Sequence, residues 1–276
     1  MTSTPRRVGR RQFLVDLGKG AVGLAVFGIA AAACSDDDAV TTTPGGSATT
    51  APVTTRGPTT TGGAATSQPP ETTLAQARSE VHRVNLGFVS AYLVARDGAA
   101  AVIDTGTGGS EGDIHAGLGT LGLDWTSVGH VIFTHDHGDH IGSAGAVLAN
   151  AAAAQAYAGA DDMQAIEQWG PVNAVGDGDR VFGLDIVATP GHTPGHISVL
   201  DPVARFLIAG DALNGEPDGS GVLGPNPGFS DDMATAIESA RKLGMLEYDD
   251  AYFGHGEPLL GGASAAVATL AESLQA

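Results

Sequence analysis

The alternation of apolar and polar residues predicts a layered domain from about residue 74 onward. Apolar runs of strand length lie at 81–89, 90–96, 99–106 and 128–135, and again at 180–189, 196–202, 205–211 and 251–254. Helical patterns lie near Glu111 to Leu121, in the Ala-rich run from Ile141 to Ala154, at 162–169, from Asp231 to Leu246 and at 264–275. Strands followed by helices in both halves predict an α/β fold in which sheets pack together with helices outside.

The first 73 residues have a different pattern. A basic stretch, RRVGRRQFLVDLG, precedes the apolar run AVGLAVFGIAAAAC, which ends at Cys34. This run is shorter than the roughly 20 residues of a spanning helix, so residues 1–33 are predicted to be a signal peptide. Residues 34–73 are almost entirely Thr, Pro, Gly, Ser and Ala. They cannot bury enough apolar surface to offset the entropy of ordering, and we expect a disordered linker before a catalytic domain at 74–276.

Two details of the leader indicate its route. The run from Arg10 to Leu14 resembles the twin-arginine export signal, and Ala31 to Cys34 resembles a bacterial lipobox, with Ala31 where Leu is usual. The resemblance implies an exported lipoprotein held at the cell membrane through a lipid on Cys34. Cleavage nearby with release of a soluble protein remains an alternative.

Charge and cysteine content exclude several classes of function. The formal net charge is −18, and without the first 33 residues it is −22. Such an acidic body repels nucleic acid and anionic membranes, so no nucleic-acid partner is expected. Because Cys34 is the single cysteine, an intrachain disulfide is excluded and a thiolate zinc site is disfavoured. The oligomeric state is left open.

The segment HDHGDH, residues 135–140, is the most informative stretch of the chain. It follows the apolar run VIF, and on extended backbone His135 and His137 point the same way and can reach one ion. Asp139 and His140 begin the next turn and can reach a neighbouring point. Imidazole and carboxylate without sulfur suit zinc, and also iron or manganese.

Further polar side chains follow other apolar runs. They are Asp104 in VIDTG, His192 and His196 in TPGHTPGH, Asp211 in AGDAL and His255 in FGHGEP. Polar groups placed repeatedly at strand ends predict one shared site at the rim of the domain.

These five pieces, in this order, resemble the metallo-β-lactamase superfamily of hydrolases, in its glyoxalase II and lactonase-like branch. The resemblance implies a four-layer αββα sandwich with two metal ions, zinc in the first place, at one edge. It implies that one ion is held by His135, His137 and His192, and the other by Asp139, His140 and His255, with Asp211 between them. Asp104 would orient a ligand, Asp139 would also accept a proton, and His196 would be structural.

The same resemblance implies the chemistry. Two divalent ions share a water and supply hydroxide at neutral pH, which attacks a small ester, thioester or lactone. Residues 214–240 contain no Lys or Arg, which disfavours an anionic glutathione thioester, and Asn214 stands where related lactonases have Tyr. The segment from Asn214 to Ser230 is expected to lie over the metal pair and to set substrate choice.

Three alternatives remain open at this point. A mononuclear iron sulfur dioxygenase would share much of the ligand set but fill one position only. A β-lactamase-like amide hydrolase would suit an exported protein, although Asp211 speaks against it. A lipoprotein that binds metal without catalysis is the third.

Overall fold

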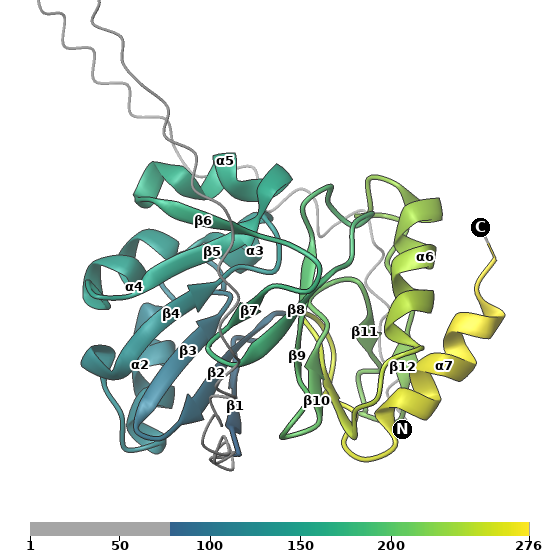
Figure 1. Cartoon of the computed structure of the whole chain (residues 1–276), viewed down its shortest axis with the longest axis horizontal. Coiled ribbons are helices and arrows are strands. Elements are labelled where there is room, and N and C mark those ends of the chain that lie inside the picture. Colours follow the sequence, from purple (N-terminus) through teal and green to yellow (C-terminus); the bar gives the residue numbers. More distant parts are fainter. Residues whose placement is uncertain (1–77, 276) are drawn as a thin grey trace, which may run out of the picture. The chain divides into compact units, whose positions relative to one another are not determined.

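The computed structural model describes residues 78–275, so the predictions made for residues 1–73 lie outside the described residues. The described chain contains two main sheets with helices on both outer sides (Figure 1). None of its helices combines the length and apolar character needed to cross a bilayer.

The first sheet has six strands in the order in which they occur in the chain. They are β1 (Glu80–Asn85), β2 (Ser90–Arg96), β3 (Ala99–Ile103), β4 (Val128–Ile132), β5 (Gln155–Gly159) and β6 (Val172–Val175). The first three pair antiparallel, and β3 to β6 run parallel. Parallel neighbours need crossovers, which are provided by α2 (Glu111–Thr120), by α3 (Gly138–Ile141) with α4 (Ala144–Asn150), and by α5 (Met163–Ile166).

The second sheet has five strands in the order β13-β10-β9-β8-β7. Their bounds are β7 (Arg180–Val181), β8 (Leu184–Ala188), β9 (Ile197–Asp201), β10 (Phe206–Ile208) and β13 (Asp250–Tyr252). The helices α6 (Met233–Leu243) and α7 (Ala263–Ser273) cover its outer face, and a small hairpin of β11 (Asn214–Gly215) and β12 (Val222–Leu223) follows β10 (Figure 1).

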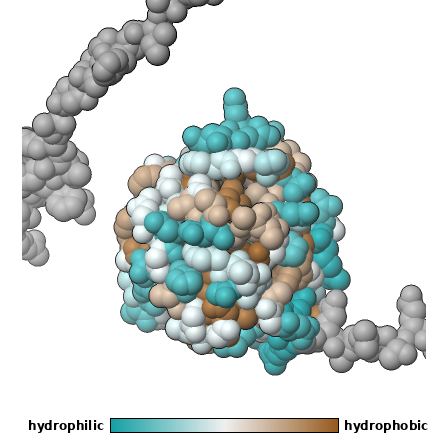
Figure 2. All heavy atoms as spheres, turned by 90° about the vertical axis from the view of Figure 1, so that its left-hand side faces the viewer, coloured by the Kyte–Doolittle hydropathy of each residue, from teal (hydrophilic) through white to brown (hydrophobic). Residues whose placement is uncertain are grey.

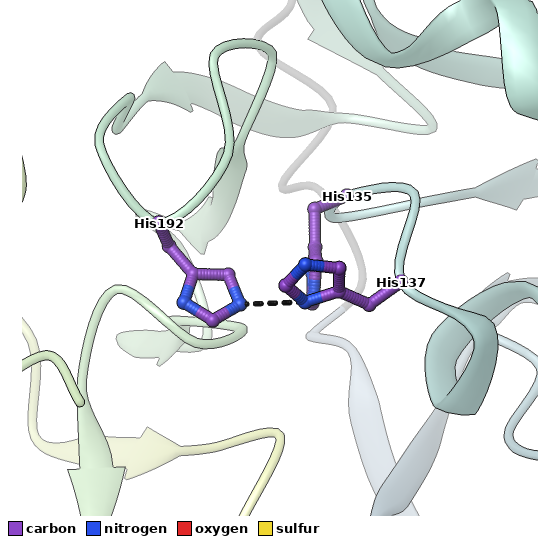
Figure 3. A group of neighbouring side chains, drawn as sticks. All are labelled: His135, His137 and His192. Atoms are coloured by element: carbon purple, nitrogen blue, oxygen red, sulfur yellow. Dashed lines mark hydrogen bonds between the residues drawn. The ribbon is translucent and has the colours of Figure 1, made fainter. Parts of the chain in front are cut away.

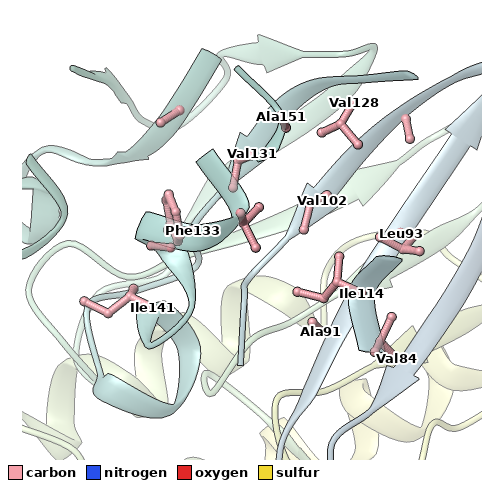
Figure 4. Close-up of a cluster of buried hydrophobic side chains, with 14 of the residues drawn as sticks. Val84, Ala91, Leu93, Val102, Ile114, Val128, Val131, Phe133, Ile141 and Ala151 are labelled. Carbon is pink, nitrogen blue, oxygen red and sulfur yellow. The ribbon is translucent and has the colours of Figure 1, made fainter. Parts of the chain in front are cut away.

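Alternation along the strands divides the core into three layers. In β2, Ala91 and Leu93 pack toward the helices of the first sheet, whereas Tyr92 and Val94 pack toward the second sheet. Figure 4 shows the first of these layers, in which Ile114 of α2 lies over the strands. A third layer joins the second sheet to α6 and α7. The predicted αββα sandwich is confirmed.

The outer face that carries the helices of the first sheet mixes hydrophilic and hydrophobic residues (Figure 2). Scattered apolar side chains of this kind are ordinary on a folded surface.

Several elements differ from the predicted pattern. The Ala-rich run from Ile141 to Ala154 is not one helix. It contains the last residue of α3 and all of α4, and the helix ends at Asn150, before β5 begins at Gln155. The sequence pattern did not predict β5 and β6. In β5 (QAYAG), Ala and Gly have low strand propensity, and β6 has only four residues, too few to show alternation. The run 180–189 is a hairpin, with Phe182 at φ 54° and Gly183 at φ 76° in the turn. Phe rarely adopts a positive φ, so the sequence does not predict a turn at this position.

Candidate metal centre

The candidate residues leave the two sheets at one edge. Asp104 follows β3 and His135 lies just beyond β4, whose carboxyl ends meet because the strands are parallel. In the second sheet, β8, β10 and β13 run the same way, and the segments after them carry His192, Asp211 and His255. The fold therefore brings together all the positions that the sequence singled out.

The first group consists of His135, His137 and His192, each of which offers a ring nitrogen within 4.8 Å of the others. His192 Nε2 lies 3.0 Å from His137 Nδ1. Figure 3 shows His192 reaching in from one side while His135 and His137 approach from the other. Three imidazoles in this arrangement are a common ligand set for zinc.

The second group consists of Asp139, His140 and His255, also within 4.8 Å of one another. Asp139 Oδ2 lies 3.5 Å from His255 Nε2. His255 Nδ1–H donates to the carbonyl of Phe88 over 2.7 Å, which leaves its Nε2 free to bind an ion.

Asp211 lies between the two groups. Its Oδ2 is 3.4 Å from His192 Nε2 and 3.1 Å from His255 Nε2. Its Oδ1 is 3.3 Å from His140 Nε2. One carboxylate thus reaches ligand nitrogens of both groups, which is the position that a bridging ligand requires.

The donor atoms fit a bound cation. His135 Nε2, His140 Nε2 and Asp211 Oδ1 are buried and make no hydrogen bond in the described chain. Buried polar atoms are almost always paired, and unpaired atoms that converge on one place indicate a missing partner. Because these are lone-pair donors, the partner they fit is a metal ion.

Burial and neighbouring charges set the protonation of these groups. Burial and the adjacent imidazoles lower the pKa of His135 well below its usual value. Burial lowers the pKa of His192 to about 4, so both rings are neutral, the form that binds a metal. Burial also lowers the pKa of His140, but Asp211 and Asp104 raise it more, to about 9. The carboxylates thus favour positive charge at His140, which a divalent cation would supply in place of a proton.

Asp104 lies behind His140 and is only 3% exposed. Its Oδ2 accepts the His140 Nδ1–H over 2.8 Å, while Thr134 donates to both of its oxygens over 2.7 Å. Asp104 has φ 59°, a conformation that Asp tolerates better than most residues. With Nδ1 of His140 bonded to Asp104, its Nε2 is the nitrogen that faces Asp211.

His196 makes no free nitrogen available. Its Nδ1 lies 2.8 Å from Thr189 Oγ1, and its Nε2 accepts the backbone N–H of Asp211 over 3.0 Å. Burial lowers its pKa to about 3, which keeps Nε2 able to accept. His196 therefore anchors the backbone of Asp211.

A pocket of about 600 Å³ opens over the two groups. It is lined by Phe88, His137, Gly138, Asp139, Asp211, Asn214, Asn226, Phe229 and His255. Asn214, Asn226 and Phe229 belong to the segment expected to cover the site. Phe88 and Phe229 are 64% and 69% exposed, and the sequence analysis did not single them out. A signal was present for Phe229, a large apolar residue directly after a glycine in the segment from Asn214 to Ser230. Phe88 lies in the apolar run 81–89, which was expected to be a strand, whereas β1 ends at Asn85.

Comparison with known proteins identifies the family. The Metallo-beta-lactamase superfamily matches residues 84–255, and the chain belongs to this superfamily. A metallo-beta-lactamase family protein from Thermus thermophilus superposes with a TM-score of 0.55 at 22% identity, over 71% of this chain and 78% of its own. That likeness supports the fold.

Curated relatives match parts of the chain. The probable metallo-hydrolase YflN of Bacillus subtilis is 43% identical over 84 residues, 27% of this chain and 32% of that protein. A hydroxyacylglutathione hydrolase of Erwinia tasmaniensis is 37% identical over 123 residues, 43% of this chain and 44% of that protein. The thioesterase pkgB of Emericella nidulans is 31% identical over 61% of this chain and 46% of its own. The chain thus spans less than half the length of each of these three relatives.

Proposed function

We propose that the chain is a dinuclear zinc-dependent hydrolase that cleaves a small ester, thioester or lactone. The observation that carries the proposal is Asp211, whose carboxylate reaches His192 of the first group and His140 and His255 of the second, while Oδ1 makes no hydrogen bond in the described chain. When bound, two divalent ions would lower the pKa of a water and polarise the substrate carbonyl.

Side chains around the two groups would transfer the proton and hold the ligands in position. Asp139 lines the pocket, and the 27% exposure of its side chain leaves it open to substrate. We assign its carboxylate to accept the proton of the attacking water and to return it to the leaving group. Asp104 and His196 hold His140 and Asp211 in place, so the ligands are oriented before substrate arrives.

The pocket indicates an uncharged substrate with an apolar group. Its lining contains no Lys or Arg, and its acidic members belong to the metal site. Phe88 and Phe229 offer aromatic surface at the mouth. An acyl chain or similar apolar group covering these rings would be stabilised, whereas an anionic glutathione moiety finds no Lys or Arg in this lining to bind its carboxylates.

The location proposed for the enzyme is outside the cytoplasm. The leader with Arg10 and Arg11 would direct export, and a lipid on Cys34 would hold the protein at the membrane. The acidic folded domain would then act on small molecules near the cell surface.

One experiment tests the chemistry. The metal content of the purified full chain is measured by mass spectrometry, and the protein is screened against thioesters, lactones, phosphodiesters and a β-lactam. Two zinc ions per chain with turnover of a thioester or lactone support the proposal. One iron per chain would instead indicate the sulfur dioxygenase, and turnover of the β-lactam alone would indicate the amide hydrolase.

A further inference from the structure

The loop that carries His192 joins β8 to β9 and therefore belongs to the second sheet. Its partners in the first group, His135 and His137, follow β4 of the first sheet. The three-histidine group is thus assembled across two sheets, and its geometry depends on how this loop is held against the first sheet.

A buried carboxylate from the first sheet reaches into this loop. Asp162 ends the turn after β5 and is 2% exposed. Its Oδ1 accepts the backbone N–H of Gly195 over 2.8 Å, and its Oδ2 accepts the Thr193 hydroxyl over 2.5 Å. Burying a carboxylate is costly, and burial raises the pKa of Asp162 above its usual value. Hydrogen bonds from the His192 loop compensate for part of this cost.

The backbone around Asp162 is shaped for this contact. A Cβ on Gly159, at the end of β5, would lie 1.9 Å from the carbonyl oxygen of Gly195. A Cβ on Gly195 would lie 2.5 Å from the backbone nitrogen of Asp162. Only glycine permits so close an approach, so the end of β5 and the loop form one tight unit.

The other side of the loop is held separately. The N–H groups of Asp231 and Asp232, just before α6, donate to the carbonyls of His192 and Gly191 over 3.1 and 2.9 Å. These bonds position the loop within the second sheet's half of the fold. At the far end of the loop, Ile197 N–H donates to the Thr134 carbonyl over 2.8 Å. Between His192 and that end, Asp162 ties the loop to the first sheet through Thr193 and Gly195.

We propose that Asp162 is a positioning residue that holds His192 opposite His135 and His137 and so sets the geometry of the first metal position without touching the metal. The inference rests on the proposed dinuclear site. The effect expected from losing such a support is a 10–100-fold loss of metal affinity, which is about what removal of outer-shell partners costs in metal sites.

Titration of the metal-free full chain with Co²⁺, followed by visible absorption, tests this role. In Asp162→Ala, the first position should bind Co²⁺ about 10–100-fold more weakly while the second stays unchanged. The spectrum should resemble that of His192→Ala rather than that of His255→Ala. Asp162→Asn keeps an acceptor for Gly195 N–H and should restore part of the affinity. Asp161→Ala, which removes the adjacent exposed carboxylate, should behave as wild type.

The readout separates this inference from the metal proposal. A wild-type chain that binds no Co²⁺ contradicts the proposed function and the inference with it. A folded Asp162→Ala variant with wild-type affinity and spectrum overturns the positioning role alone. If circular dichroism shows that this variant does not fold, Thr193→Val removes only the hydroxyl donor and decides the question: weaker binding at the first position supports the role, and unchanged binding overturns it.

Discussion

At the scale of single residues, His137 is the simplest test of the candidate site. Its ring lies in the first group and at the edge of the pocket, not in the apolar core. We expect His137→Ala to lose metal from the first position and to reduce hydrolysis to the background rate, while the domain stays folded. Metal analysis, circular dichroism and activity measured on one preparation check this. Full activity in the variant would contradict the metal assignment.

Asp104 allows a finer test, because it acts through another residue. In Asp104→Asn the amide can still accept from the Thr134 backbone N–H, but its NH₂ group would face the donating Nδ1–H of His140. We expect affinity at the second metal position to fall about 10–100-fold with little change in thermal stability. Metal competition titration measures the loss.

A matched control is available for this substitution. Asp97 is also an aspartate with positive φ, at 51°, but it is exposed and lies in the β2–β3 turn, at the opposite end of β3 from Asp104. Asp97→Asn should leave metal affinity unchanged. Equal losses in both variants would point to a backbone effect and not to the contact with His140.

The exposed rings of Phe88 and Phe229 at the pocket lead to a prediction about substrate binding. Removing the ring in Phe229→Ser takes away apolar surface worth about 1.5 kcal/mol to a covering acyl chain, which corresponds to a KM about 10-fold higher. The value of kcat should change little, because losing an apolar contact weakens binding of the ground state and of the transition state alike. A series of esters of increasing chain length checks this, and Leu260→Ser, 66% exposed elsewhere, is the control. If the KM of the wild type does not change with chain length, the proposed contact of an acyl chain with Phe88 and Phe229 is contradicted.

At the scale of elements, prediction from sequence succeeds where local pattern decides the structure. His135 and His137 could be placed correctly because they follow a buried run, and Asp104, Asp211 and His255 each follow another such run. The strand β5 could not be read, because QAYAG gains its strand conformation from pairing with β4 and β6. Asp162 was missed for the same reason: its partners Thr193 and Gly195 lie more than 30 residues away, so no local signal connects them.

The far ends of the strands hold a second cross-sheet tie. Arg96, at the end of β2, donates over 2.9 Å to Asp201 at the end of β9, whose side chain is 0% exposed. Asp201 also accepts the N–H groups of Val203 and Ala204 in the β9–β10 turn. Burial raises the pKa of Asp201, but hydrogen bonds from Ser79 and the turn, together with Arg96, lower it below its usual value.

This pair predicts a pH dependence of stability. Because the folded-state pKa of Asp201 is lowered, its contribution is present above the unfolded pKa of about 3.9 and is lost as pH falls through the folded value. We expect Asp201→Asn to cost about 2 kcal/mol of unfolding free energy at pH 7 and less below about pH 4. Urea unfolding across pH measures both. Asp249→Asn, at an exposed pair with Arg205, should change stability little.

At the scale of the whole molecule, the candidate metal centre is assembled between the two sheets of the sandwich. Neither sheet holds a complete ligand set, since the first supplies His135, His137, Asp139 and His140, and the second supplies His192, Asp211 and His255. The ordered motifs could predict which residues meet, because five separate pieces matched one family. The segment after Asp211 was expected to cover the site, and it does line the pocket together with residues of the two groups. The part played by Phe88 could not be predicted, because it depends on how the β1–β2 turn folds.

The leader supports a prediction about where this site is assembled. The twin-arginine route that Arg10 to Leu14 resembles carries folded proteins, so metal could be loaded before the chain leaves the cytoplasm. Replacing Arg10 and Arg11 together by Lys keeps the charge and removes the twin-arginine signature, and we expect the chain to remain in the cytoplasm with its metal bound. Cell fractionation with metal analysis measures this.

Cys34→Ser is the companion variant: it should still be exported but should move from the membrane to the soluble fraction, because the proposed lipid attachment point is gone. Normal export of the double Lys variant would contradict the route, and membrane retention of Cys34→Ser would contradict the anchor.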